Sequence, residues 1–454
     1  MICRSPRKSQ PPESQKTAPA MTPVRVALDQ PSPYGVPFWR AYLANTAVMV
    51  AIALLFRYAD FVTLLGGTEL HLGWIVGAGT VGSLLMRLFL GTAIDRYGPR
   101  LVWLLSLLLF AASCFAHLAV ARYNGPAIYL LRIAFCSAIA GIMGSAMTFI
   151  TGRAPVERMA ELIGMLGTSG FLGIVLGTQL GDLLLGTETI QRWQVDRMFL
   201  VAGTLGLCAV LFAWGATRGQ ARPVRRRRPP PLWLLRRYHP GMVLLVGVAM
   251  GIGVGLPTTF LRTYAAELSI PRIGLFFGVY APMAILTRIL TRRLPERLGL
   301  APMILTGLGV LVVGQLLLVM VRSEWMFIAP GMVYGIGHAI LVPATVATGS
   351  AAFPSRYRGL GTTVILATFD VGNLLGAPMA GAIVHFSGRV GLPGYPTMFV
   401  SVAALLGLVG AAYGLTNWGE NGRPSKIRRP RGRRFVRPAQ PVAERPLIEV
   451  AGKG

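Results

Sequence analysis

The stretch GTAIDRYGPR, residues 91–100, places an acid and two arginines at the point where a long apolar run ends. In the second half of the chain, RRLPERLG at 292–299 follows another apolar run with the same order of acid, arginine and glycine. The two segments therefore look like copies of one feature that lies where an apolar segment stops.

The composition explains the apolar runs. The chain has 454 residues, of which 53% are hydrophobic and 13% charged, and its mean hydropathy is +0.57. Soluble domains carry about 25% charged residues. Apolar stretches of about 20 residues recur along the chain, and a helix of that length crosses the hydrocarbon core of a bilayer. Barrel strands alternate polar and apolar residues instead. The sequence therefore predicts an all-α polytopic membrane protein.

Twelve membrane-spanning helices are expected, joined by short connections except between the sixth and the seventh. Their expected positions are 41–65, 72–94, 100–120, 126–150, 160–185, 198–217, 241–265, 273–293, 301–321, 326–350, 360–384 and 396–416. The expected domains are a polar, disordered N-terminal tail at 1–40, a six-helix half at 41–217, a basic linker at 218–240, a second six-helix half at 241–416 and a basic, disordered tail at 417–454.

Most of the 44 Lys and Arg residues fall in the tails and connections of one predicted face. Loops with this bias stay on the cytoplasmic side of a membrane. We therefore expect both termini, and the linker, in the cytoplasm of a cell whose membrane holds the chain. A net charge of +27 and a basic run such as RRRR at 225–228 are also typical of proteins that bind nucleic acid, which is the alternative partner. Because topology already accounts for these charges, we expect contacts with lipid headgroups and no nucleic acid.

The copied segment belongs to a longer internal repeat. A shift of 201 residues superposes Gly73, Gly77, Arg87, Asp95, Arg96 and Gly98 on Gly274, Gly278, Arg288, Glu296, Arg297 and Gly299. A shift of 199 residues superposes Pro155, Gly173 and Gly177 on Pro354, Gly372 and Gly376. Six spans are thus repeated in the same order and, since six is even, in the same orientation. Such a parallel repeat is typical of transporters that rock two halves around a site between them.

On these residues the chain resembles the major facilitator superfamily (MFS). GTAIDRYGPR resembles the family signature after the second span, except that Pro99 stands where a basic residue is usual. Arg132 matches the arginine of a second family motif in span four. GIVLGTQLGD at 173–182 resembles the antiporter motif, but Thr178 replaces its proline. The resemblance covers about residues 38–416 and implies the MFS fold with alternating access to a central cavity.

The resemblance also implies a gate at the cytoplasmic side. A carboxylate at position 95 would stabilise the exposed N–H groups at the start of span eleven and hold that side shut. Arg96 and Arg100 would then pair with Glu157 and Glu161. The alternative is a plain basic loop that turns at its glycine. The candidate gating residues are Gly91, Asp95, Arg96, Gly98, Arg100, Glu296, Arg297 and Gly299.

Ionisable residues inside spans are candidates for substrate binding, because a charge in hydrocarbon needs a partner or a function. The resemblance assigns spans one, four, seven and ten to the central cavity. Arg57, Arg132 and Arg262 from three of these spans are expected to form a cation cluster for an anionic solute, with Asn45 as a weaker candidate. The alternative is that the arginines snorkel outward or pair with acids such as Asp60.

His338 and Asp370 are expected at a similar depth near the middle of the membrane. A histidine and a buried carboxyl together could load and release a proton, so we expect them to couple transport to protons, with Asp60 as the next candidate. The alternative is a structural hydrogen bond between helices. Small residues at four-residue spacing let helices pack closely; here these are Gly173, Gly177, Gly372 and Gly376.

The sequence shows no glycine-rich phosphate loop followed by lysine, no zinc-protease spacing and no nucleophile elbow. We therefore expect neither an enzyme nor a bound cofactor or metal. The predicted function is secondary active transport of a small organic solute by a monomer, coupled to protons, with a preference for an anionic solute and an undecided direction. The alternative is a membrane receptor or assembly protein that keeps the fold without transport.

Overall fold

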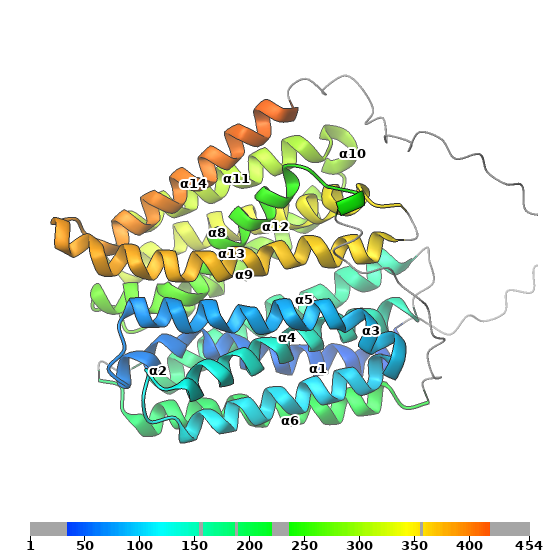
Figure 1. The fold of residues 1–454 in the computed structure, drawn as a ribbon, viewed down its shortest axis with the longest axis horizontal. Coiled ribbons are helices and arrows are strands. Elements are labelled where there is room, and N and C mark those ends of the chain that lie inside the picture. Colours follow the sequence, from blue (N-terminus) through cyan, green and yellow to red (C-terminus); the bar gives the residue numbers. More distant parts are fainter. Residues whose placement is uncertain (1–33, 154–157, 187–188, 220–235, 355–356, 418–454) are drawn as a thin grey trace, which may run out of the picture.

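The computed structural model describes residues 34–153, 158–186, 189–219, 236–354 and 357–417 (Figure 1). This part of the chain is helical and contains no strand. The expected tails, apart from 34–40 and Asn417, lie outside the described residues, as does most of the basic linker.

The first half consists of α1 (Val36–Leu54), η1 (Leu55–Arg57), α2 (Tyr58–Leu64), α3 (Glu69–Ala116), η2 (His117–Ala119), α4 (Pro126–Thr151), α5 (Met159–Leu185) and α6 (Arg192–Ala216). The second half consists of α8 (Val243–Glu267), α9 (Gly274–Thr291), α10 (Leu294–Leu298), α11 (Leu300–Val319), η4 (Glu324–Phe327), α12 (Ile328–Ala351), α13 (Arg358–Ser387), η6 (Gly388–Val390) and α14 (Gly394–Asn417).

Within the described residues, eleven helical segments are long and apolar enough to cross a membrane. One of them, which contains α3, holds two spans, because the backbone of Gly98 has φ 85° and ψ 154° and the helix does not continue through it. Figure 1 shows the two arms of α3 meeting in a turn at one end of the bundle. The described part of the chain therefore contains the twelve predicted spans in two six-helix halves.

The internal repeat extends to the backbone of the copied segment. Gly299, between α10 and α11, has φ 81° and ψ 170°, almost the conformation of Gly98. A side chain is strained at such angles, so glycine is the residue that this turn requires. Pro99 occupies the first turn after Gly98, where a missing N–H costs no helical hydrogen bond. This explains how a proline replaces the usual basic residue.

The first span begins earlier than expected. Its helix starts at Val36, with Pro37 in the first turn and an extended Gly35 before it, rather than at 41. Pro is favoured in this position because its fixed φ suits a helix start. The last span, Gly394–Asn417, also exceeds the expected 396–416. In both places the helix continues past the expected end of the span, because the hydrophobic pattern alone does not define where a helix begins or ends.

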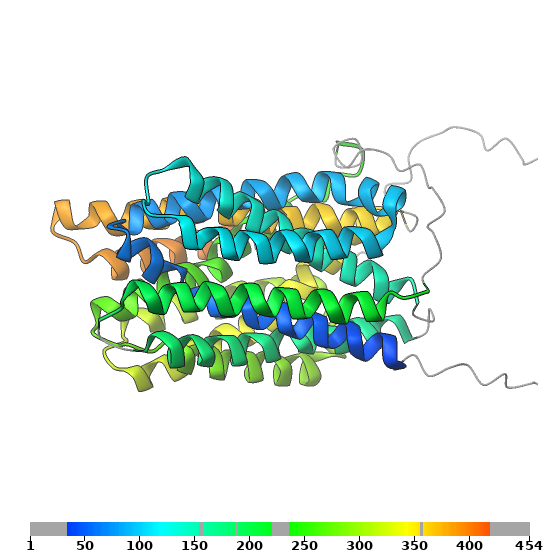
Figure 2. The ribbon, with the colours of Figure 1, turned by 90° about the horizontal axis from the view of Figure 1, so that it is seen from below.

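The end of the bundle that holds the turns at Gly98 and Gly299 is called the Gly98 end, and the other the opposite end. The start of α1 and the end of α14 both lie toward the Gly98 end (Figures 1 and 2). The two halves meet along two seams, one between α3 and α13 and the other between α5 and α9. A site between the halves is therefore bordered by these seams.

The four glycines predicted to pack helices lie at close helix contacts. A Cβ atom at Gly173 would lie 2.3 Å from the Cβ of Met49 on α1, and Gly177 is equally close to the same helix. A Cβ atom at Gly372 would lie 2.2 Å from a backbone oxygen of α8, and Gly376 contacts that helix too. In each half, one helix thus approaches its neighbour almost backbone to backbone.

Candidate substrate-binding site

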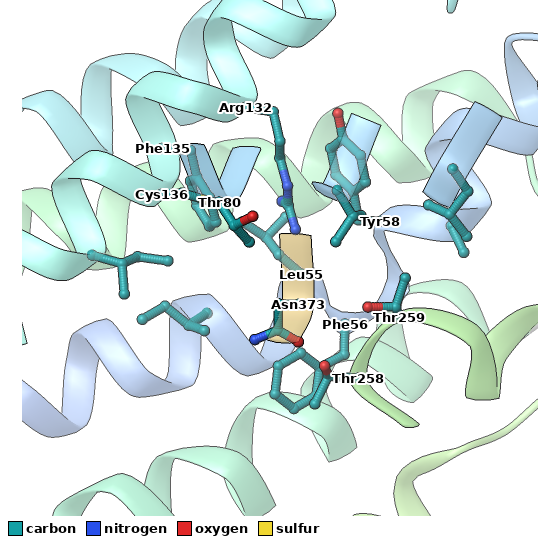
Figure 3. Close-up of a pocket in the computed structure, with 15 residues that line it drawn as sticks. Leu55, Phe56, Tyr58, Thr80, Arg132, Phe135, Cys136, Thr258, Thr259 and Asn373 are labelled. Atoms are coloured by element: carbon teal, nitrogen blue, oxygen red, sulfur yellow. The ribbon is translucent and has the colours of Figure 1, made fainter. Parts of the chain in front are cut away.

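A cavity of about 260 Å³ lies between the halves. Its walls come from η1 and the helices around it, from α3 and α4 of the first half, and from α8 and α13 of the second (Figure 3). Most of the lining is apolar, including Ile52, Leu55, Phe56, Leu72, Val76 and Ile139. The few polar groups on this surface therefore decide which solute it accepts.

Arg132, on α4, is the cation of this cavity. Figure 3 shows its side chain extending from the helix toward the cavity. The guanidinium carbon lies 4.3 Å from the centre of the Tyr58 ring and 4.9 Å from that of Phe135. Its buried Nε has no hydrogen-bond partner among the described residues. Gly79 makes room for the arginine, because a Cβ atom there would lie 2.7 Å from its Cγ.

No acid occurs among the described residues that line the cavity. The hydroxyl of Thr80 donates to the backbone oxygen of Gly77 at 2.6 Å, and Thr258 and Thr259 both donate to the oxygen of Gly255. Such local bonds use the hydroxyl hydrogens and leave the oxygens as acceptors. Arg132 therefore faces the cavity without a carboxylate to neutralise it.

The other two arginines of the expected cation cluster lie elsewhere. Arg57 donates to Asp60 at 2.7 Å, to Asp182 at 3.0 Å and to the backbone oxygen of Leu185 at 2.8 Å. Arg262 from the second half contacts the other oxygen of Asp60 at 2.8 Å. The predicted three-arginine cluster is therefore wrong: two of its members are buried in ion pairs, the alternative that the sequence left open.

These ion pairs join the halves toward the opposite end. The side chains of Arg57, Asp60, Asp182 and Arg262 are all less than a tenth exposed. Asp182 also accepts hydrogen bonds from the backbone N–H groups at the start of α9 in the second half, at 3.2 and 2.5 Å. Removing one partner from such a network leaves an uncompensated buried charge. We call these four residues the buried ion network.

Asn45 lies within the first half rather than in the cavity wall. Its Nδ2 donates to the hydroxyl of Ser169 at 2.7 Å, and both side chains are buried between α1 and α5. The structure thus gives Asn45 a partner inside its own half.

Asp370 and His338 do not form the expected pair in the described structure. Asp370 on α13 accepts from Arg87 at 2.5 Å and from Ser83 at 2.6 Å, both on α3. His338 shares a 2.5 Å hydrogen bond with the hydroxyl of Tyr280 on α9. The two residues therefore lie on different seams, because the periodicity that set their depth does not set which neighbour each faces.

Sequence reasoning found Arg87 as a repeated residue but missed its role as the partner of Asp370. The internal repeat is the sequence feature that relates this pair to a second one: Arg288 corresponds to Arg87, and Phe171 corresponds to Asp370. The structure places the guanidinium carbon of Arg288 4.8 Å from the centre of the Phe171 ring. The same contact between halves is thus an ion pair in one seam and a cation–π contact in the other.

At the signature, Glu161 accepts hydrogen bonds from Arg158 at 3.0 and 3.1 Å and from Tyr34, rather than from Arg96 or Arg100. Glu157 lies outside the described residues. The guanidinium of Arg96 lies 5.2 Å from the neighbouring Tyr97 ring. The gating role of the signature stays a prediction.

Comparison with known proteins agrees with this architecture. The chain is 25% identical over 401 residues to an uncharacterized MFS-type transporter of Pseudomonas aeruginosa, covering 84% of this chain and 96% of the relative. It is 22% identical over 384 residues to the multidrug resistance protein MdtG of Citrobacter koseri, covering 81% and 91%. The solved structure of the nucleoside transporter NupG shares the fold with a TM-score of 0.67 at 13% identity, covering 84% and 98%.

The family profile described as Major Facilitator Superfamily matches residues 38–294 and 243–450, almost all of the helical part of the chain. The twelve spans, the parallel repeat and the cavity between the halves fit that match. The protein therefore belongs to the major facilitator superfamily of membrane transporters.

Proposed function

We propose that this protein is a secondary active transporter that moves a small organic anion across the cell membrane by alternating access. One observation carries the proposal: Arg132 lines the cavity, its Nε has no protein partner among the described residues, and no described lining residue is an acid. A cation removed from water without a counterion is costly. An anionic solute that binds the guanidinium would supply that counterion in the form of a charge-assisted, two-pronged hydrogen bond.

The buried ion network supports alternating access. It joins Arg57 and Asp60 of the first half to Arg262 of the second, so the halves are held together toward the opposite end. With both termini on the cytoplasmic side, as the charge distribution favours, this conformation is closed toward the outside. Transport then requires the six-helix halves at 41–217 and 241–416 to rock, which opens the network and closes the Gly98 end. The cavity lies within one chain, so a monomer suffices.

Proton coupling is proposed at Asp370 rather than at a histidine–aspartate pair. Asp370 and Asn373 lie one turn apart on α13, and Asn373 lines the cavity. Protonation of Asp370 would remove its charge and weaken the bond to Arg87 that joins the halves. Loading a proton would thus loosen the seam between α3 and α13. His338, bonded to Tyr280, is proposed to position α9 against α12.

The test is uptake into proteoliposomes of purified protein, with a panel of small carboxylates and with or without a pH gradient. We expect a gradient to drive accumulation of at least one carboxylate and Arg132→Gln to abolish it. Arg122→Gln removes the same charge from an exposed residue outside the cavity and serves as the matched control. Equal uptake by the two variants would contradict the role of Arg132.

The coupling site has its own variant. Asp370→Asn imitates the protonated carboxyl, so we expect exchange of solute to persist while accumulation driven by pH alone disappears. If Asp370→Asn still concentrates solute under a pH gradient, the proton travels elsewhere, and Asp60 is the next residue to test.

A further inference from the structure

We propose that the solute is an amphipathic monoanion: one carboxylate-like group bound by Arg132, a short apolar body, and a neutral hydrogen-bonding group, such as a hydroxyl, that reaches Asn373. This inference rests on the proposed function and specifies the chemical class of its substrate. It follows from three properties of the cavity, namely its charge, its unused hydrogen-bonding groups and its size.

The charge of the lining restricts the solute to a single negative charge. Arg132 is the one cation among the described lining residues, and no described lining residue is an acid. A second carboxylate on the solute would be buried against apolar side chains without a counterion, and so would an ammonium group. An unpaired buried charge costs several kcal/mol. Dianions and zwitterions are therefore disfavoured.

The hydrogen-bonding groups define the far end of the solute. The hydroxyls of Thr80, Thr258 and Thr259 already donate to backbone oxygens, so toward the cavity they only accept. Asn373 has no hydrogen bond with any other described side chain or backbone group. Its carboxamide oxygen would be 1.8 Å from a Cβ atom at Gly255, so a glycine there admits it. The second half thus offers acceptors at Thr258 and Thr259 and both an acceptor and unused donors at Asn373, which together match a neutral hydroxyl that can donate and accept.

The positions of these groups set an order along the solute. Figure 3 shows Arg132 and Asn373 on opposite sides of the cavity. Phe56 and Thr258 lie nearer to Asn373 in the same view. Arg132 belongs to the first half and Asn373 to the second, so a solute that binds both touches both moving halves. A solute with only the anionic group would bind one half and leave Asn373 unmatched.

The volume limits the length of the apolar body. The cavity has a volume of about 260 Å³. Sites for drug-sized ligands start at about 300 Å³. The solute is therefore small, on the scale of a five-carbon acid.

The experiment uses four acids with the same five-carbon chain and different far ends: pentanoate, 5-hydroxypentanoate, glutarate and 5-aminopentanoate. Binding to the purified full-length protein is measured by calorimetry, and competition is measured in proteoliposome uptake. We expect 5-hydroxypentanoate to bind best, at least tenfold more tightly than glutarate or 5-aminopentanoate. The affinity of pentanoate should be weaker than that of 5-hydroxypentanoate but stronger than those of the other two acids. The missing hydrogen bond separates the first two acids and the unpaired charge separates the rest.

A single substitution should invert this order. Asn373→Asp places a carboxylate opposite Arg132, so we expect the variant to prefer the zwitterion 5-aminopentanoate over 5-hydroxypentanoate. Asn417→Asp adds the same charge at the end of α14, far from the cavity, and should keep the wild-type order. Thermal melting and gel filtration show whether each variant is folded, and the wild-type comparison decides the proposal even if Asn373→Asp does not fold.

The outcomes separate this inference from the proposed function. If glutarate or 5-aminopentanoate binds the wild-type protein best, the monoanion inference is wrong, while an effect of Arg132→Gln on that binding would leave the anion transporter standing. If a folded Asn373→Asp keeps the wild-type order, Asn373 does not face the solute. If none of the four acids binds, the monoanion inference is wrong, and the wider carboxylate panel with Arg132→Gln decides the proposed anion function separately.

Discussion

At the scale of the residue, Arg132 differs from the other arginines in spans that the sequence singled out. Arg57 and Arg262 neutralise carboxylates in the buried ion network, whereas Arg132 lies between the rings of Tyr58 and Phe135. An aromatic face binds a cation without occupying the N–H groups at the edge of the guanidinium. These N–H groups therefore stay available for a solute.

Arg132→Lys tests whether this geometry matters beyond charge. Lysine keeps the positive charge but lacks the planar fork that binds a carboxylate with two parallel hydrogen bonds. We expect kcat/KM for anion uptake to fall about tenfold or more, equivalent to about 1.4 kcal/mol. Wild-type activity in the lysine variant would mean that the residue supplies only positive potential.

The site was partly predictable at this scale. Arg132 could be found because a charge inside an apolar run is costly and because the residue matches the arginine of a family motif in span four. Pairing of Arg57 and Arg262 with Asp60 was open as the alternative. Asp182 as a further partner of Arg57 could not be predicted, since it is far away in sequence and the direction of each side chain depends on how the halves meet. Asn373 was missed because an uncharged amide in a span gives a weak signal, although it lies three residues after Asp370.

At the scale of the element, one backbone conformation creates two spans from a single apolar run. The two arms of α3 are joined at Gly98, whose φ of 85° and ψ of 154° are allowed almost only for glycine. The hydrophobic pattern predicted a break between residues 94 and 100, and the structure supplies its cause. The repeat made the same prediction for Gly299.

Gly98→Ala should destabilise this turn. A Cβ atom at these angles costs about 1–3 kcal/mol, so we expect a lower melting temperature for the purified protein. Gly407→Ala is the matched control, because Gly407 is helical and a Cβ atom there would meet nothing within 4 Å. Equal melting temperatures for the two variants would show that the turn tolerates a side chain.

The second element-scale feature is the contact between α5 and α9 toward the opposite end. Asp182 on α5 accepts from Arg57 and from the backbone at Ile273 and Gly274. Asp182→Asn removes the charge that holds Arg57 and the start of α9. We expect this variant to populate conformations in which the halves separate at the opposite end.

Spin labels at positions 122 and 322, in a background without the native cysteines, measure that separation. The expected result is a new, longer distance in Asp182→Asn. Asp196→Asn is the control, because Asp196 pairs with Arg192 within α6 and does not join the halves. A distance distribution that is unchanged in Asp182→Asn would argue against the buried ion network as a gate.

At the scale of the whole molecule, the fold was predictable and its seams were not. Composition and length gave the spans, and the repeated charged segments gave the two halves with one orientation. Which residues meet between the halves depends on the conformation of the transport cycle, so Arg87–Asp370 and Phe171–Arg288 had no counterpart in the hydrophobic pattern.

The orientation of the molecule is a separate prediction from the charge distribution. A reporter fused after Gly219 or after Gly454 should be cytoplasmic, and one inserted near Thr187 should be external, because basic connections remain inside. Activity assays of a phosphatase and a fluorescent protein at each position give the side directly. Any fusion on the wrong side would overturn the proposed topology.

The most direct test of the central claim is counterflow. Proteoliposomes loaded with an unlabelled small carboxylate are diluted into a trace of the labelled form, with no pH gradient present. If the cavity that holds Arg132 opens alternately to the two sides of the membrane, the wild-type protein and Arg122→Gln should transiently accumulate the label. Arg132→Gln should accumulate none. Absence of counterflow for every carboxylate bound by the wild-type protein would contradict transport and favour a membrane receptor that keeps this fold.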